Sequence, residues 1–182
     1  MLHIWTGILV LALLSRDGEA QSCKPGVQEV VPNLAKGRPA FQSSTYEYTK
    51  SLAADKAVDG NCHGHLDHVG SCTHTNGDLE PWWYVDLGDH YAIFAVVVKN
   101  REECCGERLR GAEIHVGDSV AENGKFNPLC GTVMDTSLGS ISTVRCHGLR
   151  GRYVTVIIPG RSEALTLCEV EVYGMKVEEM CR

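Results

Sequence analysis

A histidine and two arginines that could take part in a binding site lie in polar segments of the chain. His74 is followed by 26 residues and then Arg101, and Arg108 stands seven positions further on. Each guanidinium is a rigid fork of hydrogen-bond donors, so these side chains could hold a ligand in a fixed direction. Taken singly, each has a plain alternative. Surface arginines usually stay solvated or pair with carboxylates, here those of Glu102, Glu103 and Glu107, and a loop histidine is usually just exposed.

Two adjacent cysteines, Cys104 and Cys105, lie between the arginines. Consecutive Cα atoms are ~3.8 Å apart, closer than the ~4.4–6.8 Å usual across a disulfide. A bond between neighbours strains the peptide that joins them. Geometry alone therefore favours two different partners for these cysteines.

Two further segments contain possible metal ligands. The run Lys56-Ala57-Val58-Asp59-Gly60-Asn61 carries a carboxylate, although simple Asp-Gly turn chemistry also explains it. The run Cys62-His63-x-His65-x-x-His68 could suggest zinc, but its spacing fits no standard structural zinc pattern. No paired carboxylates, nucleophile with its base, or open metal site is visible, so we predict that the protein is not an enzyme.

The elements that must position these residues are predicted to be β-strands. Leu167–Tyr173 alternates, so that Cys168, Val170 and Val172 share one face. Other strands are indicated by runs rich in aromatic and β-branched residues, separated by turn dipeptides; these runs are 82–87, 91–98 and 153–158, and the turns are Gly88-Asp89 and Pro159-Gly160.

Only one short helical turn is expected, within residues 51–58, with Ser51 as its N-cap. The long helices of a βαβ fold are missing, and the pattern favours an all-β sandwich or barrel. Long polar loops at 42–50, 61–80 and 101–111 are where binding residues are expected on such a scaffold.

Composition and the apolar start indicate a secreted protein. The apolar run at residues 1–14, followed by small residues near Ala20, is typical of a signal peptide and shorter than the ~20 residues that span a membrane. The nine cysteines all follow this segment, which suits an oxidising, extracellular compartment. With a net charge of −6 and no basic cluster, the chain is not expected to bind nucleic acid, nor to insert into a membrane.

We expect four parts: a signal peptide (1–20), a leader carrying Cys23 (21–32), one β-domain (33–174) and a charged tail containing Cys181 (175–182).

The spaced histidine and arginines, together with the dicysteine, resemble the signature of the F-type lectins, or fucolectins. In that family a His is followed by 26 residues, Arg-x-Asp, four residues and Arg or Lys. The resemblance extends over about residues 33–173 and implies a jelly-roll-type, discoidin-like β-sandwich with its sugar site in loops at one end. The chain departs at Glu103, where the family has Asp, a change that puts affinity and fine specificity in question.

The resemblance implies a site for L-fucose, a neutral 6-deoxy sugar with an axial 4-hydroxyl. Arg101, Arg108 and His74 would hydrogen-bond the edge that carries this hydroxyl, and fixed donors would be left unpaired by the wrong epimer. A Cys104–Cys105 ring would give a flat sulfur surface against the sugar. The family alignment further implies that Glu103 holds the arginines and that the methyl group lies near Tyr48 and Leu66-Asp67-His68.

The same resemblance implies one Ca²⁺ ion that supports the loops without touching sugar. Asp59 and Glu169 would supply carboxylates, and Ser71 its hydroxyl or carbonyl oxygen, a set that suits calcium. Backbone carbonyls would come from Lys56, Asn61 and Cys168. Disulfides are implied between Cys72 and Cys168, between Cys104 and Cys105, and between Cys130 and Cys146.

Three cysteines fall outside that family set. Cys23 could pair with Cys181, which would leave Cys62 as the odd thiol. With one binding motif per chain, avidity would need several chains, and family precedent favours a homotrimer. The leading hypothesis is a secreted lectin for fucosylated glycans, in innate immune recognition; the alternative is a discoidin-like adhesion module for protein or lipid ligands.

Overall fold

The computed structural model describes residues 23, 31–66 and 70–178. The expected signal peptide, the rest of the leader, His68 and Cys181 lie outside these residues. None of the described helices is long and apolar enough to cross a membrane.

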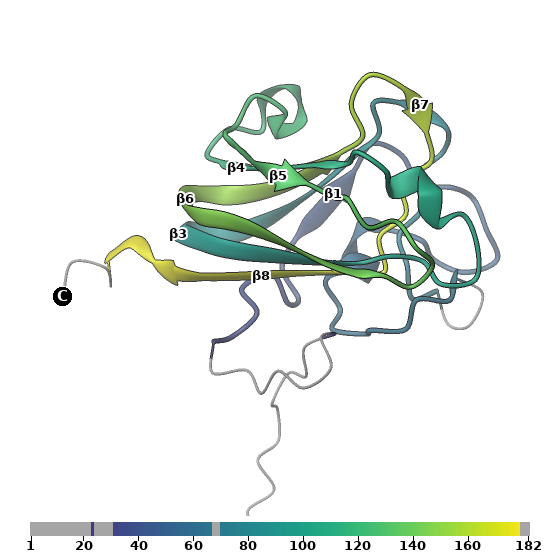
Figure 1. Ribbon diagram of the computed structural model, residues 1–182, viewed down its shortest axis with the longest axis horizontal. Coiled ribbons are helices and arrows are strands. Elements are labelled where there is room, and N and C mark those ends of the chain that lie inside the picture. The colour runs from purple at the N-terminus through teal and green to yellow at the C-terminus, as the bar shows by residue number, and fades with distance from the viewer. Residues whose placement is uncertain (1–22, 24–30, 67–69, 179–182) are drawn as a thin grey trace, which may run out of the picture.

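The molecule is a β-sandwich built around two long strands, as the all-β prediction required (Figure 1). These are β3 (Trp82–Lys99) and β6 (Ile141–Ile157), which pair with each other antiparallel along most of their length. The remaining strands are short: β1 (Ala40–Gln42), β2 (Asp78–Leu79), β4 (Glu113–Gly117), β5 (Leu129–Thr132), β7 (Ser162–Glu163) and β8 (Glu169–Lys176). The main sheet runs β1-β3-β6-β4-β5, with β8 paired to the second half of β3, and β2 pairs with β7 separately.

The two predicted strands at 82–87 and 91–98 are one strand with an irregularity. Gly88 has a positive φ of 79°, and the register with β6 shifts between Asp86 and Tyr91. The chain therefore bulges at the predicted turn without ending the strand. The first half of β3 pairs with β1 and the second with β8, so both halves turn one face toward a shared core.

That core is formed by alternate residues of the long strands, as the period of two predicts. Trp83, Val85 and Leu87 of β3 are fully buried, and they pack with Val154 and Val156 of β6. The β8 prediction also holds, since Val170 and Val172 are buried. Unexpectedly, Glu169 and Glu171 on its other face are buried too.

Three short 3-10 turns lie wholly within the described residues: η1 (Ala54–Ala57), η3 (Gly106–Leu109) and η4 (Ala121–Gly124). The turn expected within 51–58 is η1, but the Ser51 cap is wrong: the N-cap is Ala53, without a side-chain hydrogen bond. The indole of Trp83 donates to the Ala54 carbonyl at 2.9 Å and holds η1 against the core.

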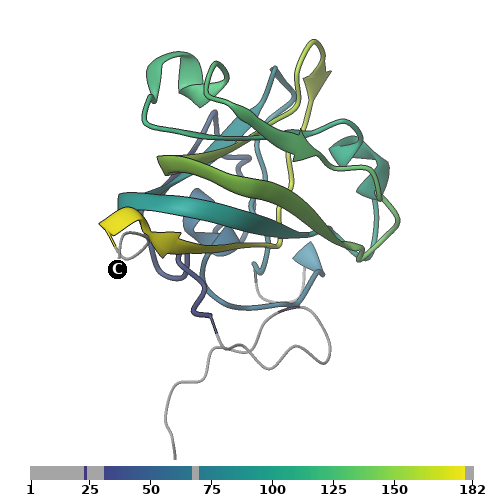
Figure 2. The ribbon, with the colours of Figure 1, turned by 60° about the vertical axis from the view of Figure 1, so that its left-hand side comes forward.

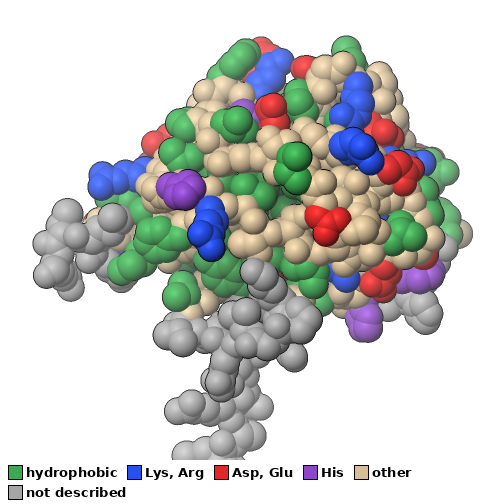
Figure 3. Space-filling view, in the orientation of Figure 1, with side chains coloured by type: hydrophobic (Ala, Val, Ile, Leu, Met, Phe, Trp, Pro, Cys, Tyr) green, Lys and Arg blue, Asp and Glu red, His purple; other side chains and the backbone are tan. Residues whose placement is uncertain are grey.

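The long loops gather at one end of the sandwich, away from the end at which β8 finishes (Figures 1 and 2). On the face shown in Figure 3, basic and acidic side chains are interspersed, including a group near η3 and β7. The two layers thus act as a rigid base for loops that come from distant parts of the sequence.

Candidate functional site

His74 is placed by a backbone segment that runs beside the strand leading into β8. Thr73 and Thr75 donate backbone hydrogen bonds to Leu167 and Leu165 at 2.8 and 3.0 Å, and the Cys72–Cys168 disulfide closes the end of this pairing. His74 itself donates its backbone N–H to the Leu52 carbonyl at 3.0 Å. The histidine is therefore fixed from both sides of its own backbone.

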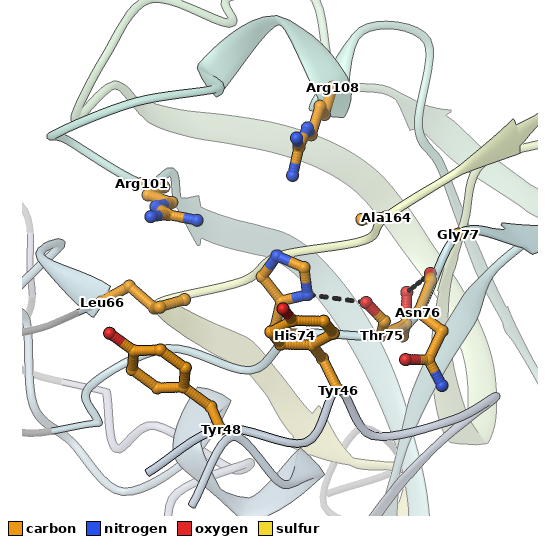
Figure 4. A pocket seen from close by; sticks show the side chains of 10 residues that line it. All are labelled: Tyr46, Tyr48, Leu66, His74, Thr75, Asn76, Gly77, Arg101, Arg108 and Ala164. Carbon is orange, nitrogen blue, oxygen red and sulfur yellow. Dashed lines mark hydrogen bonds between the residues drawn. The ribbon is translucent and has the colours of Figure 1, made fainter. Parts of the chain in front are cut away.

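The hydrogen bond of the His74 ring determines its tautomer. Nδ1 lies 2.6 Å from the Thr75 carbonyl oxygen, which can only accept, so Nδ1 carries the proton. Burial lowers the pKa of the imidazole, the Thr75 bond opposes that effect, and the charges of Arg101 and Arg108 lower the pKa further. The neutral ring thus presents a bare Nε2, which Figure 4 shows on the side of the two arginines.

Arg101 follows the end of β3 and is clamped by Glu103. Its Nε and its terminal nitrogen both lie 2.5 Å from Oε1 of Glu103. The same oxygen accepts the backbone N–H of Leu66 at 3.2 Å. Glu103, which stands where the F-type lectin signature has Asp, therefore holds the arginine and also fixes the backbone of Leu66, and it is not among the residues that line the cavity described below.

Arg108 is presented by η3. Cys105 precedes this turn with a positive φ of 61°, and the turn places Arg108 Nε 3.6 Å from a carboxylate oxygen of Glu163 on β7. Arg161 donates to the backbone carbonyl of Arg108 at 2.9 Å. Sequence reasoning missed both partners, because they lie more than fifty positions away.

The dicysteine is bonded to itself, Cys104 to Cys105. The expectation of separate partners, drawn from chain geometry alone, is wrong, and the pairing implied by the family resemblance is present. The bond stiffens the short segment between Arg101 and η3. Neither sulfur belongs to the cavity wall described next, so their contact with a ligand stays a prediction.

The three predicted side chains converge on one open cavity of about 510 Å³ (Figure 4). Tyr48 and Leu66 lie at the same cavity, as predicted. Five lining residues were not predicted: Tyr46, Thr75, Asn76, Gly77 and Ala164. Of these, only Tyr46 carried a usable signal, being an aromatic residue two positions from Tyr48 in a polar loop.

Comparison with known proteins places the chain in a family. Residues 56–156 match the family described as NedA-like, galactose-binding domain. A fucolectin of Anguilla anguilla is 43% identical over 143 residues, covering 77% of this chain and 89% of that protein. Fucolectin-4 of Anguilla japonica is 44% identical over 171 residues, covering 92% of each. The chain belongs to the fucolectins.

Solved structures agree with this assignment of a fucolectin fold. The f-lectin (fucolectin) from striped bass (Morone saxatilis) serum superposes with a TM-score of 0.74 at 44% identity, over 79% of this chain and 47% of that one, about half its length. A Streptococcus pneumoniae fucose binding module gives a TM-score of 0.65 at 28% identity, over 79% and 96%. These relatives are lectins, which confirms the prediction of a protein without catalytic activity.

A second cluster of this fucolectin contains the predicted calcium ligands. Glu169 Oε2 accepts the backbone N–H of Gly60 at 3.2 Å, beside Asp59, whereas Oε1 is buried without a hydrogen-bond partner among the described residues. Burial, together with the charge of Asp59, raises the pKa of Glu169 to about 9. Burial also raises the pKa of Asp59.

The buried Oε1 of Glu169 favours a bound cation, because burying a hydrogen-bond acceptor without a partner costs free energy. Ser71 lies next to the Cys72–Cys168 disulfide, but its hydroxyl donates to the His65 carbonyl at 2.9 Å. Asn61 donates its backbone N–H to Asp59. The Nζ of Lys56 lies 4.0 Å from Oδ2 of Asp59. The carboxylate pair therefore fits a hard, oxygen-seeking ion such as Ca²⁺.

The remaining disulfides correct one prediction. Cys130 pairs with Cys146 as expected, but Cys23 pairs with Cys62. The suggested Cys23–Cys181 bond and a free Cys62 are therefore wrong. Cys23 is held next to Cys62 because Glu171 accepts its backbone N–H at 2.6 Å, a buried contact that sequence could not reveal. Cys62 therefore cannot serve as a ligand of the alternative zinc site, because zinc binds a cysteine thiolate and not a disulfide sulfur.

Proposed function

We propose that this fucolectin binds terminal L-fucose on glycans through His74, Arg101 and Arg108. The observation that carries the proposal is the convergence of these three side chains on one open cavity (Figure 4). Named relatives support it, since the chain matches fucolectins and resembles a fucose binding module. A discoidin-like adhesion module for protein or lipid would have no use for this set of donors.

Each side chain has a distinct part in holding a hydroxyl. The unprotonated Nε2 of His74 accepts a hydrogen bond from one sugar hydroxyl. The guanidinium groups of Arg101 and Arg108 donate hydrogen bonds to the oxygen of that hydroxyl and to its neighbours. The axial 4-hydroxyl of L-fucose can satisfy both needs at once. An epimer with an equatorial hydroxyl would leave these donors unpaired, which costs free energy.

The methyl group of fucose is proposed to lie against Leu66 and Tyr48. Leu66 is only 5% exposed, and its backbone is fixed by Glu103. Both residues border the cavity on the Arg101 side of His74 (Figure 4). This apolar wall favours a 6-deoxy sugar over one that carries a 6-hydroxyl, because the hydroxyl would lose its hydrogen bonds to water there without gaining a partner.

The direct test is titration calorimetry of the oxidised protein with L-fucose, L-galactose and 6-deoxy-L-glucose. L-Galactose differs by a 6-hydroxyl, and 6-deoxy-L-glucose differs only at C4. We expect L-fucose to bind, L-galactose to bind more weakly and 6-deoxy-L-glucose not to bind detectably. Absence of binding to L-fucose and to every fucosylated glycan on an array would contradict the proposal.

Sugar affinity should depend on pH through His74. Because the pKa of this imidazole lies below its ordinary value, the ring is neutral at pH 7 and above, where affinity should be constant. Acidification through that lowered pKa protonates Nε2, removes the acceptor and adds a third positive charge beside the arginines. We expect L-fucose affinity to fall as the pH is lowered through that pKa, by about 10-fold for each pH unit below it.

The control is His74→Gln, which keeps a polar side chain that cannot titrate. Its affinity, although weaker, should be flat over the same pH range. If the variant loses affinity with acid as steeply as the native protein, carboxylates such as Glu103 or Glu163 carry the effect and the role given to His74 is wrong.

We also propose a structural Ca²⁺ ion at Asp59 and Glu169. The unpartnered Glu169 oxygen and the raised pKa values of both carboxyl groups support it. When bound, the ion neutralises the carboxylates and stabilises the loops between Asp59 and Cys72. Carbonyl or hydroxyl oxygens of Lys56, Asn61, Ser71 and Cys168 would complete the site.

Finally, we propose a secreted homo-oligomer, a trimer by family resemblance, that serves innate immune recognition outside the cell. Four disulfides support an oxidising compartment. The proposed parts of the chain are those of the sequence analysis, with β8 continuing to Lys176.

Light scattering should give a mass that is a multiple of one chain, because one weak site per chain needs several chains for avidity. Nine cysteines less the eight in disulfides leave Cys181. Gels of the native protein and Cys181→Ser, with and without reductant, decide whether this residue links chains. A monodisperse monomer at working concentration would contradict the oligomer.

A further inference from the structure

The two arginines of the cavity are joined by a short loop that does not by itself fix the distance between them. Arg101 follows β3, Arg108 lies on η3, and residues 102–105 connect them without regular secondary structure. The bond between Cys104 and Cys105 stiffens only one end of this loop, because it joins neighbouring residues. The relative position of the two guanidinium groups therefore depends on what holds the ends of the loop together.

The side chain of Asn100 connects these two ends. Its Oδ1 accepts the backbone N–H of Arg101 at 2.9 Å, and its Nδ2 donates to the carbonyl of Gly106, the first residue of η3, at 3.1 Å. The same nitrogen lies 3.4 Å from the carbonyl oxygen of Thr136 and 3.3 Å from that of Ser137. One planar amide thus ties the start of the loop, η3 and the segment after β5 to a single point.

This junction is buried and tightly packed. Asn100 is 2% exposed, and its own backbone N–H donates to the Ser140 carbonyl at 2.9 Å. A Cβ placed on Gly106 would lie 2.6 Å from the Thr136 carbonyl oxygen and 3.1 Å from Nδ2 of Asn100, so the segments approach as closely as a glycine allows. The junction has one favourable arrangement, because a buried polar group left without a partner costs free energy.

We propose that Asn100 is a positioning residue, which sets the distance between Arg101 and Arg108 and so aligns both guanidinium groups on one sugar hydroxyl. The proposal rests on the proposed function. Asn100 does not line the cavity and acts through the backbone at either end of the loop. Directed hydrogen bonds need donors held within about 0.5 Å, a precision that requires a packed and hydrogen-bonded support.

The test replaces Asn100 with alanine and measures L-fucose affinity by titration calorimetry. Without the amide, η3 and the backbone of Arg101 are free to separate. We expect binding to weaken about 10-fold or more, the effect of losing one hydrogen bond to a charged group. Gly106→Ala should do the same, because its methyl group pushes η3 away from Thr136 while Asn100 stays intact.

The imidazole of His74 gives a measurement that a loss of stability alone would not change. Burial lowers the pKa of this ring, and the charges of Arg101 and Arg108 lower it further. When the arginines lose their alignment in Asn100→Ala, the pKa of His74 should rise toward its ordinary value. NMR titration without sugar measures this rise, and the His74 resonances are identified by their absence from the spectrum of His74→Gln.

Asn127→Ala is the matched control. Asn127 is also a buried asparagine, 9% exposed, and its side chain bonds both the backbone N–H and the carbonyl of Ser119, outside the cavity wall. This variant should melt at a lower temperature than the native protein. Its L-fucose affinity should stay within about 2-fold of native, and the titration of His74 should not change.

An affinity of Asn100→Ala within about 2-fold of native would overturn the proposal. So would an equal loss in Asn127→Ala, or weaker binding without a change in the His74 titration. Failure of both Asn100→Ala and Gly106→Ala to fold, seen by circular dichroism, would show that Asn100 serves the fold alone. If the native protein does not bind L-fucose, the proposed function fails, while the His74 titration still decides whether Asn100 aligns the arginines.

Discussion

Replacing Arg108 with alanine should abolish measurable binding of L-fucose while the fold survives. A hydrogen bond to a charged group contributes roughly 1.5–3 kcal/mol, and a monosaccharide bound at millimolar affinity has only about −4 kcal/mol in total. The truncation leaves no buried charge, because the partner carboxylate of Glu163 stays 27% exposed. Calorimetry with L-fucose measures the loss, and circular dichroism with a thermal melt verifies the fold.

His74→Ala should have the same effect on binding. Arg101→Ala should also abolish binding but should cost stability as well. The Glu103 side chain is only 17% exposed and would lose the arginine that it holds. Arg101→Lys keeps the charge while removing the fork, so it separates binding from folding.

Arg150→Ala is the matched control, since Arg150 is an exposed arginine of β6 outside the cavity wall. It should bind L-fucose like the native protein. Undiminished affinity in the His74, Arg101 and Arg108 variants together would show that the sugar binds elsewhere.

Removal of calcium should lower the melting temperature by about 5–10 °C. A ligand held at 100 times its Kd stabilises the folded state by about 2.7 kcal/mol, and each kcal/mol shifts the melting temperature of a domain of this size by roughly 2–4 °C. The physical reason is the buried carboxyl group of Glu169 beside Asp59, since an ionised carboxylate at a buried position needs a cation. Thermal melts in excess Ca²⁺ and in chelator measure the difference.

Glu169→Gln gives the sharper form of this experiment. Without an ion, the raised pKa of Glu169 keeps its carboxyl group protonated at pH 7, so the neutral amide should melt near the native protein in chelator. With Ca²⁺ the native protein should gain stability and the variant should not. Equal melting temperatures of the native protein with and without chelator, with metal analysis showing none bound, would contradict the site and point to Lys36, whose charge lowers the pKa of Glu169, as the counter-ion.

Local sequence patterns determined the scaffold and the main site residues. Alternation of apolar residues predicted the buried face of β8, because side-chain direction in a strand follows the local backbone. Runs rich in aromatic and β-branched residues predicted parts of β3 and β6. The resemblance of His74, Arg101 and Arg108 to the F-type lectin signature implied one site, and the three residues do line one cavity. Residue type and local patterns suffice for the strands, whereas the site needed the resemblance.

Pairings between distant segments were decided only by the tertiary structure. The partner of Cys23 depends on where this residue lies against the sandwich, and its buried contact with Glu171 brings it to Cys62. Continuity of β3 through Gly88 depends on β6, which pairs with the strand on both sides of the bulge. Neither partner is adjacent in the chain, so no local propensity encodes the choice.

The end of the cavity lined by Asn76 and Gly77 was likewise decided by the tertiary structure and not by local sequence. Asn76 and Gly77 look like turn residues in the sequence, and turn chemistry alone explains their types. They become a wall beside Tyr46 only because Ser44 and Asp78 brace two loops against each other. A binding site is a property of surfaces that meet in space, and these surfaces come from loops whose approach is set by the packing of the whole sandwich.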